Sequence, residues 1–121
     1  MFEHVGFEVS DLERSARFYD PLMFALGARR MFEGPGAIAY GIDTPKLWIV
    51  ARGRPPAPGF GHVAIAAAGK VAVDAAFKAG IGHGGRDDGA PGPRPQYGPS
   101  YYAAYLLDPD GYRVEVVSGG S

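Results

Sequence analysis

The 121-residue chain contains no cysteine. This absence excludes disulfide bonds, thiolate metal sites and cysteine nucleophiles. The chain also has almost no net charge, because 12 Lys and Arg residues against 13 Asp and Glu residues leave −1 at pH 7. A protein with this balance offers no basic face to nucleic-acid phosphates or to anionic lipid headgroups. We therefore expect neither a nucleic-acid partner nor a membrane partner.

Long apolar runs are missing as well. No stretch reaches the length that a membrane-spanning helix needs, and Met1 leads into a strand-like pattern without a signal-peptide pattern. We expect a cytoplasmic protein. The hydrophobic fraction of 46% and the charged fraction of 21% are those of an ordinary globular domain with its own core. The chain does have many glycines (19) and prolines (11), and these cluster in the predicted connections.

The first half of the chain predicts one strand, one helix and three short strands. Alternating residues 2–9 form the first strand, with His4 on its polar face. Ser10 and Glu13 form a capping box, which places a helix start at Ser10. Pro21 predicts a kink or a second helix start, since Asp20-Pro21 is typical of a helix N-terminus. Three strands are expected over residues 28–33, 37–41 and 47–51.

The second half repeats this order. After a linker rich in Pro and Gly, a strand over residues 61–67 carries His62 at its front, as the first strand carries His4. A helix is predicted over residues 70–83 and a short strand over 86–88. A loop with four prolines then runs to Pro99, a length typical of binding loops. We place one half at about 1–53, the linker at 54–60 and the other half at about 61–118.

The final hairpin, residues 101–117, carries Glu115 between two valines. Taken alone, Glu115 is most simply a solvated residue on the outer face of a strand. The hairpin turn is Asp108-Pro109-Asp110-Gly111, in which glycine accepts the left-handed conformation.

The register of this hairpin decides where its tyrosines lie. If Gly111 forms a one-residue bulge, Tyr105 lies opposite Glu115, and Tyr105 and Tyr101 face a cleft. Without the bulge, Ala104 faces Glu115 and the tyrosines enter the core. We favour the bulge.

Three segments of the chain resemble the vicinal oxygen chelate superfamily, which includes glyoxalase I, bleomycin-resistance proteins and extradiol dioxygenases. They are EHVGFEVSDLERSARFYDPLMFALG, GFGHVAIAA and PQYGPSYYAAYLLDPDGYRVEVV. The resemblance implies an α+β fold in which paired βαβββ modules form a curved-sheet cleft with a divalent metal on its concave face. It also implies a homodimer, with the cleft either within one chain or across the dimer.

By this resemblance the metal ligands are His4, His62 and Glu115. The last strand of the first module, KLWIVAR, has no His, Gln or carboxylate where glyoxalase I carries a fourth ligand. This departure moves the ligand set toward the two His and one carboxylate of extradiol dioxygenases. About three positions of a six-coordinate ion then stay open, which suits Fe, Mn, Zn or Ni. Glu115 is also the candidate catalytic base.

Five further residues are candidate substrate contacts, although aromatic residues in a small domain often serve only packing: Tyr105, Tyr101, Trp48, Tyr97 and Arg113. We assign His83 a structural role near a helix C-terminus and Glu8 a place at the rim of the cleft.

Three functions are compatible with this pattern. The first is a metal-dependent enzyme acting on a small vicinal-oxygen compound by isomerase, lyase or ring-cleaving chemistry. The second is a binding protein of the bleomycin-resistance type, which sequesters a ligand without chemistry. The third, a structural protein that has lost its metal, ranks last. Only the first function requires the full set of His4, His62 and Glu115.

Overall fold

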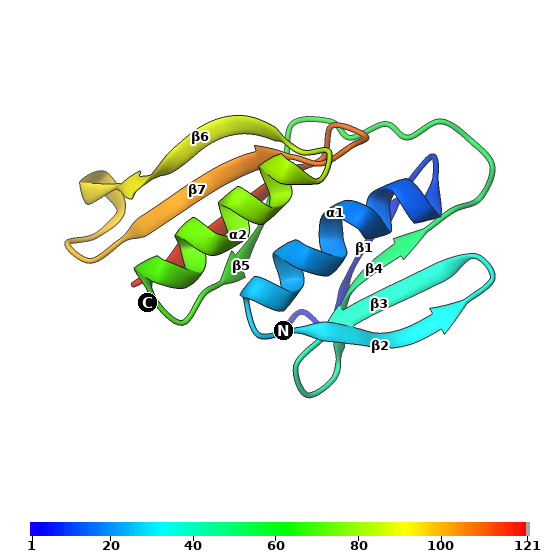
Figure 1. Ribbon diagram of the computed structural model, residues 1–121, viewed down its shortest axis with the longest axis horizontal. Coiled ribbons are helices and arrows are strands. Elements are labelled where there is room, and N and C mark those ends of the chain that lie inside the picture. The colour runs from blue at the N-terminus through cyan, green and yellow to red at the C-terminus, as the bar shows by residue number, and fades with distance from the viewer. Residues whose placement is uncertain (121) are drawn as a thin grey trace.

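The computed structural model describes residues 1–120, which form two βαβββ modules (Figure 1). Module one consists of β1 (Val5–Glu8), α1 (Leu12–Ala25), β2 (Arg29–Gly34), β3 (Ala37–Gly41) and β4 (Pro45–Val50). Module two consists of β5 (His62–Ala66), α2 (Lys70–Gly82), β6 (Arg86–Pro93), η1 (Pro95–Tyr97), β7 (Tyr102–Leu107) and β8 (Arg113–Ser118). The α+β fold of paired βαβββ modules, which the family resemblance implies, is confirmed.

Each module has its own four-stranded sheet, with strand orders β1-β4-β3-β2 and β5-β8-β7-β6. The first strand of each module runs parallel to the last, and the other neighbours are antiparallel. The same topology therefore occurs twice. β1 and β5 each have a strand partner on one side only, so each sheet has a free edge at its first strand.

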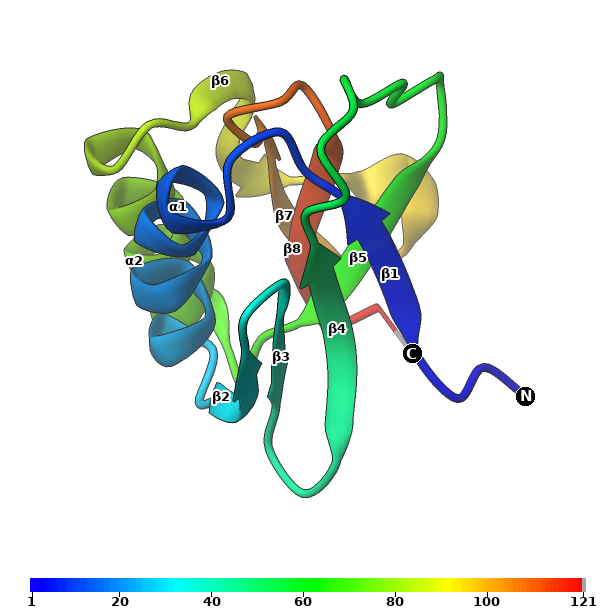
Figure 2. The same cartoon turned by 90° about the vertical axis from the view of Figure 1, so that its right-hand side faces the viewer.

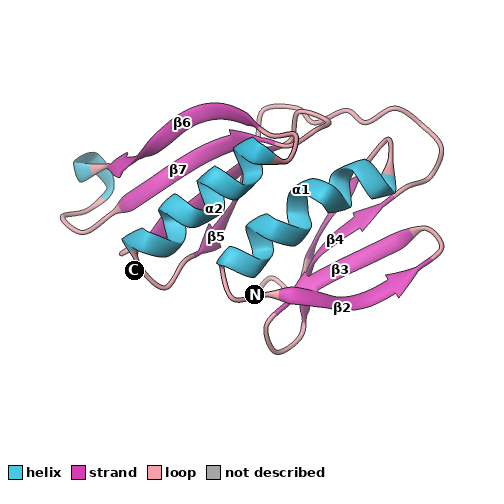
Figure 3. Cartoon of the chain, in the orientation of Figure 1, coloured by secondary structure: helices cyan, strands magenta, loops and turns pink. Residues whose placement is uncertain are grey.

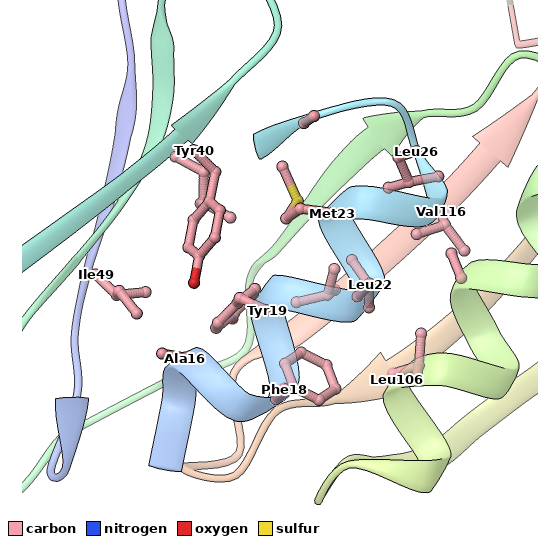
Figure 4. Packing of buried hydrophobic residues seen from close by; sticks show 14 of the residues in the cluster. Ala16, Phe18, Tyr19, Leu22, Met23, Leu26, Tyr40, Ile49, Leu106 and Val116 are labelled. Atoms are coloured by element: carbon pink, nitrogen blue, oxygen red, sulfur yellow. The ribbon is translucent and has the colours of Figure 1, made fainter. Parts of the chain in front are cut away.

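The two helices pack against each other on one side of the sheets (Figures 1 and 2). Figure 4 shows the core around α1, whose Phe18, Tyr19 and Leu22 are fully buried. These side chains share one apolar cluster with Ile49 of β4 and Leu106 of β7. Because α1 contributes to the packing of both modules, the two sheets are held in one body around it.

The start of α1 differs from the sequence prediction. Asp11, not Ser10, caps the helix, and its side chain accepts a hydrogen bond from the Arg14 amide at 3.0 Å. The amide and hydroxyl of Ser10 instead donate to the carboxylate of Asp110 in the β7–β8 turn, at 3.0 and 2.6 Å. The prediction of a capping box at Ser10 was wrong, because Ser10 instead forms hydrogen bonds between the two modules.

The predicted interruption at Pro21 is also wrong, because α1 is one helix with Pro21 inside it. Asp20 does not act as a new helix cap. Its carboxylate accepts hydrogen bonds from Arg30 at 2.7 and 2.9 Å and from the Tyr40 hydroxyl at 2.6 Å. These contacts to β2 and β3 hold the segment in place, and tertiary packing thereby overrides the local signal.

The segment after α2 is more regular than predicted. β6 extends from Arg86 to Pro93 with irregular pairing to β7, and a single 3₁₀ turn follows it (Figure 3). In the final hairpin the favoured bulge is confirmed, since Tyr105 pairs with Glu115 and the Asp108 amide donates to the Tyr112 carbonyl at 2.8 Å. Gly111 has a φ of 96°, the left-handed conformation that the turn requires.

Neither helix within residues 1–120 has the length and apolar character needed to cross a membrane.

Candidate functional site

On the sheet faces turned away from the helices, a polar contact joins two of the predicted ligands, His62 and Glu115. β5 and β8 are parallel neighbours, and Ala64 pairs with Glu115. His62 precedes Ala64 by two residues, so its side chain lies on the same face of the sheet as that of Glu115. His62 Nε2 lies 3.0 Å from Glu115 Oε1. Glu115 is only 2% exposed, so its carboxylate depends on protein partners.

The second oxygen of Glu115 is bound by Tyr101. The Tyr101 hydroxyl donates to Oε2 at 2.6 Å, and this bond raises the pKa of Tyr101 to about 12. Tyr101 therefore stays protonated at neutral pH and fixes the orientation of the carboxylate. The sequence predicted Tyr101 as a substrate contact, and its bond to Glu115 was not foreseen.

Tyr105 lies next to His62 and Glu115. Its ring centroid lies 6.0 Å from that of His62. The guanidinium carbons of Arg113 and Arg94 lie over the ring, 4.1 and 5.7 Å from its centroid. Arg113 also forms an ion pair with Asp88 at 2.6 Å. Arg94 was missed by the sequence reasoning, which marked its proline-rich segment as a binding loop but singled out only Tyr97 in it.

His4 does not join the pair within this chain. Its Nδ1 lies 2.5 Å from Glu3 Oε1, and its ring centroid lies 6.3 Å from that of Trp48. His4 and His62 do line the same groove, which has a volume of about 840 Å³ and is lined by residues of both β1 and β5. Among residues 1–120, no group of three or more His, Cys, Asp or Glu side chains is arranged to hold a metal ion.

Two of the three predicted ligands nevertheless have a geometry that suits a metal. Two ligand atoms at right angles, each about 2.1 Å from an ion, are about 3.0 Å apart. His62 Nε2 and Glu115 Oε1 have this separation. Tyr101 adds the kind of hydrogen bond that orients metal-binding carboxylates. The residues present therefore fit one half of a metal site, with imidazole and carboxylate donors but without a third donor from the same chain.

The fold and the sequence both match known proteins. The model of the Glyoxalase/Bleomycin resistance protein/Dioxygenase superfamily matches residues 1–116. A glyoxalase/bleomycin resistance protein from Albidiferax ferrireducens T118 is 33% identical, with 97% of each chain covered and a TM-score of 0.86. The chain belongs to this superfamily.

Two more distant structures of the superfamily fold are similar to this chain. The fosfomycin resistance protein FosX from Mesorhizobium loti is 20% identical, covers 98% of this chain and 92% of its own, and has a TM-score of 0.71. A V278E mutant of glyoxalase I from Zea mays is 28% identical over 95% of this chain and 44% of its own, with a TM-score of 0.72. No curated protein matches the chain.

In module one, the register assigns Trp48 to the place that Glu115 has in module two. Gly6, two residues after His4, pairs with Trp48, just as Ala64, two residues after His62, pairs with Glu115. The Trp48 ring lies 5.3 Å from that of Phe32. Where the resemblance to glyoxalase I implies a fourth ligand, this chain therefore has an aromatic side chain in contact with Phe32.

The remaining predicted residues lie at the margin. Tyr97 is exposed in η1, with its ring 5.4 Å from that of Tyr101. Glu8 accepts hydrogen bonds from Arg54 and Arg52, and the Arg54 guanidinium holds the pKa of the Glu8 carboxyl below its usual value. His83 Nδ1 lies 2.7 Å from the Ala79 carbonyl at the end of α2, which agrees with a structural role.

Proposed function

We propose that the protein is a metal-dependent enzyme acting on a small molecule with two adjacent oxygen atoms. The observation that carries the proposal is the His62–Glu115 pair, whose 3.0 Å separation suits two ligands of one ion. A bound divalent ion supplies a Lewis acid that polarises the substrate oxygens. Whether the overall reaction is an isomerisation, a lyase reaction or a ring cleavage depends on the substrate.

The third ligand in this proposal is His4 of a second copy, in a homodimer. The edge strands β1 and β5, one from each sheet, border the groove that His4 and His62 line. Unpaired strand edges are surfaces on which another chain can dock. A two-fold dimer would repeat such a contact, so that each copy gives its His4 to the other copy's His62 and Glu115.

The other predicted residues have distinct roles in this proposal. Tyr101 holds Glu115 Oε2, leaving Oε1 to face His62. Among residues 1–120, Glu115 is the only buried carboxylate at this site, and once detached from the ion it would be the base for a substrate proton. The proposed substrate contacts are Tyr105, Trp48, Tyr97 and Arg113, and the three aromatic rings among them would exclude water from the reacting oxygens.

Metal analysis tests the proposal directly. We expect protein purified without chelator, or reloaded with Mn(II) or Zn(II), to bind one divalent ion per chain. His62→Ala should abolish binding, whereas His83→Ala should leave it unchanged, because His83 contacts only a helix carbonyl. Metal binding that His62→Ala does not alter would refute the assignment.

A binding protein of the bleomycin-resistance type is the second candidate. It is favoured by the lack, within residues 1–120 of one chain, of a three-residue metal cluster. Titration of catechol, a small vicinal dioxygen compound, separates the two functions. Equal affinity with and without metal supports sequestration, and affinity that requires the metal supports the enzyme.

A further inference from the structure

Arg94 differs from the other half-buried arginines of the protein. Three arginines are half-buried: Arg30, Arg94 and Arg113. Arg30 pairs with Asp20 and Glu33, and Arg113 pairs with Asp88. Within residues 1–120, Arg94 has no carboxylate partner at salt-bridge distance, so its charge is not balanced by a neighbouring acid.

The guanidinium of Arg94 is nevertheless fixed in place. Nη2 donates to the Ala90 carbonyl at 2.9 Å, and Nη1 donates to the Pro93 carbonyl at 3.3 Å. Because Gly89 and Gly92 on β6 have no side chains, they leave space for the guanidinium of Arg94. A Cβ on Gly92 would lie 3.2 Å from Nη1, and one on Gly89 would lie 3.5 Å from Nη2.

This arginine lies beside Tyr105, the strand neighbour of Glu115. Its guanidinium carbon is 5.7 Å from the centroid of the Tyr105 ring, and Tyr105 pairs directly with Glu115 across β7 and β8. Two carbonyl bonds use only part of the five N–H donors of a guanidinium. The remaining donors, with a full positive charge, suit a carboxylate or another planar anion.

We infer that the substrate carries an anionic group, most simply a carboxylate, in addition to its adjacent oxygens, and that Arg94 selects it. This inference rests on the proposed function, because it places the adjacent oxygens at His62 and Glu115. Arg94 is then the residue that determines specificity. It distinguishes charged from neutral members of one substrate class.

Two probes that differ by one carboxylate test the inference: catechol and 3,4-dihydroxybenzoate. Calorimetric titrations would use Mn(II)-loaded wild type, Arg94→Gln, Arg94→Lys and the control Arg17→Gln, which removes an exposed charge on α1. We expect wild type and Arg17→Gln to bind 3,4-dihydroxybenzoate about 10- to 100-fold more tightly than catechol. Arg94→Gln should lose this preference without weaker catechol binding, and Arg94→Lys should recover part of it.

The metal content of each sample separates the two proposals. If wild type takes up no metal, the proposed enzyme function fails, and the same titrations on metal-free protein still report the preference of Arg94. The inference is overturned if wild type does not prefer the carboxylated probe, if it binds neither probe, or if Arg94→Gln keeps the preference.

Discussion

The two modules share one topology but differ in the faces that they turn away from the helices. Module two presents a connected set of polar groups, in which Glu115 contacts His62 and Tyr101 while Arg113 lies over Tyr105. At the position equivalent to Glu115, module one presents Trp48. In the proposed site, module two therefore supplies most of the polar groups, and module one adds His4 and the aromatic side chain of Trp48.

The turns of the modules differ in the same way. Asp108 in the β7–β8 turn is buried and accepts hydrogen bonds from the Tyr19 hydroxyl and from the amides of Asp110 and Tyr112. In the corresponding β3–β4 connection, Asp43 is exposed. The turn of module two is thus anchored to α1 of module one, which fixes the hairpin that carries Glu115.

The largest expected effect concerns the equivalent positions Glu115 and Trp48. Glu115→Gln removes the anionic ligand and should weaken metal binding by at least about 100-fold, measured by metal titration. Trp48→Phe should leave metal affinity unchanged, because no metal ligand is removed. Equal losses in the two variants would mean that the modules do not differ as described.

The anchored turn should matter for stability. Asp108→Ala leaves the Tyr19 hydroxyl and two amides without their acceptor and should lower the free energy of unfolding by about 2–3 kcal/mol. Asp43→Ala should lower it by less than about 0.5 kcal/mol. Urea denaturation of both variants checks this contrast, and a cost shared equally by the two turns would contradict it.

Acid pH should sharpen the contrast between the turns. Burial raises the pKa of Asp108, although the Tyr19 hydroxyl and the Tyr112 amide oppose the rise. The folded state therefore binds a proton more readily than the unfolded state, whose pKa is about 3.9. The resulting stabilisation is complete below the unfolded pKa and disappears as pH rises through the folded pKa. The stability difference between wild type and Asp108→Ala should accordingly be larger at pH 4 than at pH 7.

Local sequence signals were sufficient wherever a turn or a repeat decides the structure. The left-handed conformation at Gly111 sets the hairpin register, and Tyr105 accordingly lies opposite Glu115. The equivalence of His4 and His62 also followed from the repeat. Their distance from each other did not, because it depends on how the modules pack, and no local pattern encodes that packing.

Side-chain partners from distant parts of the chain were likewise beyond local signals. Pro21 stays inside α1 because Asp20 is bonded to Arg30 and Tyr40 in other elements. The sequence around Arg94 does not distinguish it from other arginines. It stands out only in the structure, where its neighbours are backbone carbonyls and the Tyr105 ring, and no described carboxylate pairs with it.

A smaller effect is expected when module one is made more like module two. Trp48→Glu places a carboxylate where the register gives module two its Glu115. We expect metal affinity to rise about tenfold, about 1.4 kcal/mol, because a further anionic ligand becomes available. Trp48→Gln is the uncharged control. If the two variants bind metal equally, position 48 does not face the metal site.

The most direct test of the central claim is the metal content of co-expressed His4→Ala and His62→Ala chains. Each variant alone should bind no metal. If His4 of one copy completes the His62–Glu115 pair of the other, the mixture should recover about a quarter of the wild-type metal, because half of the dimers are mixed and each has one intact site. Absence of any recovery in the mixture, with dimers present, would contradict a site built across two copies.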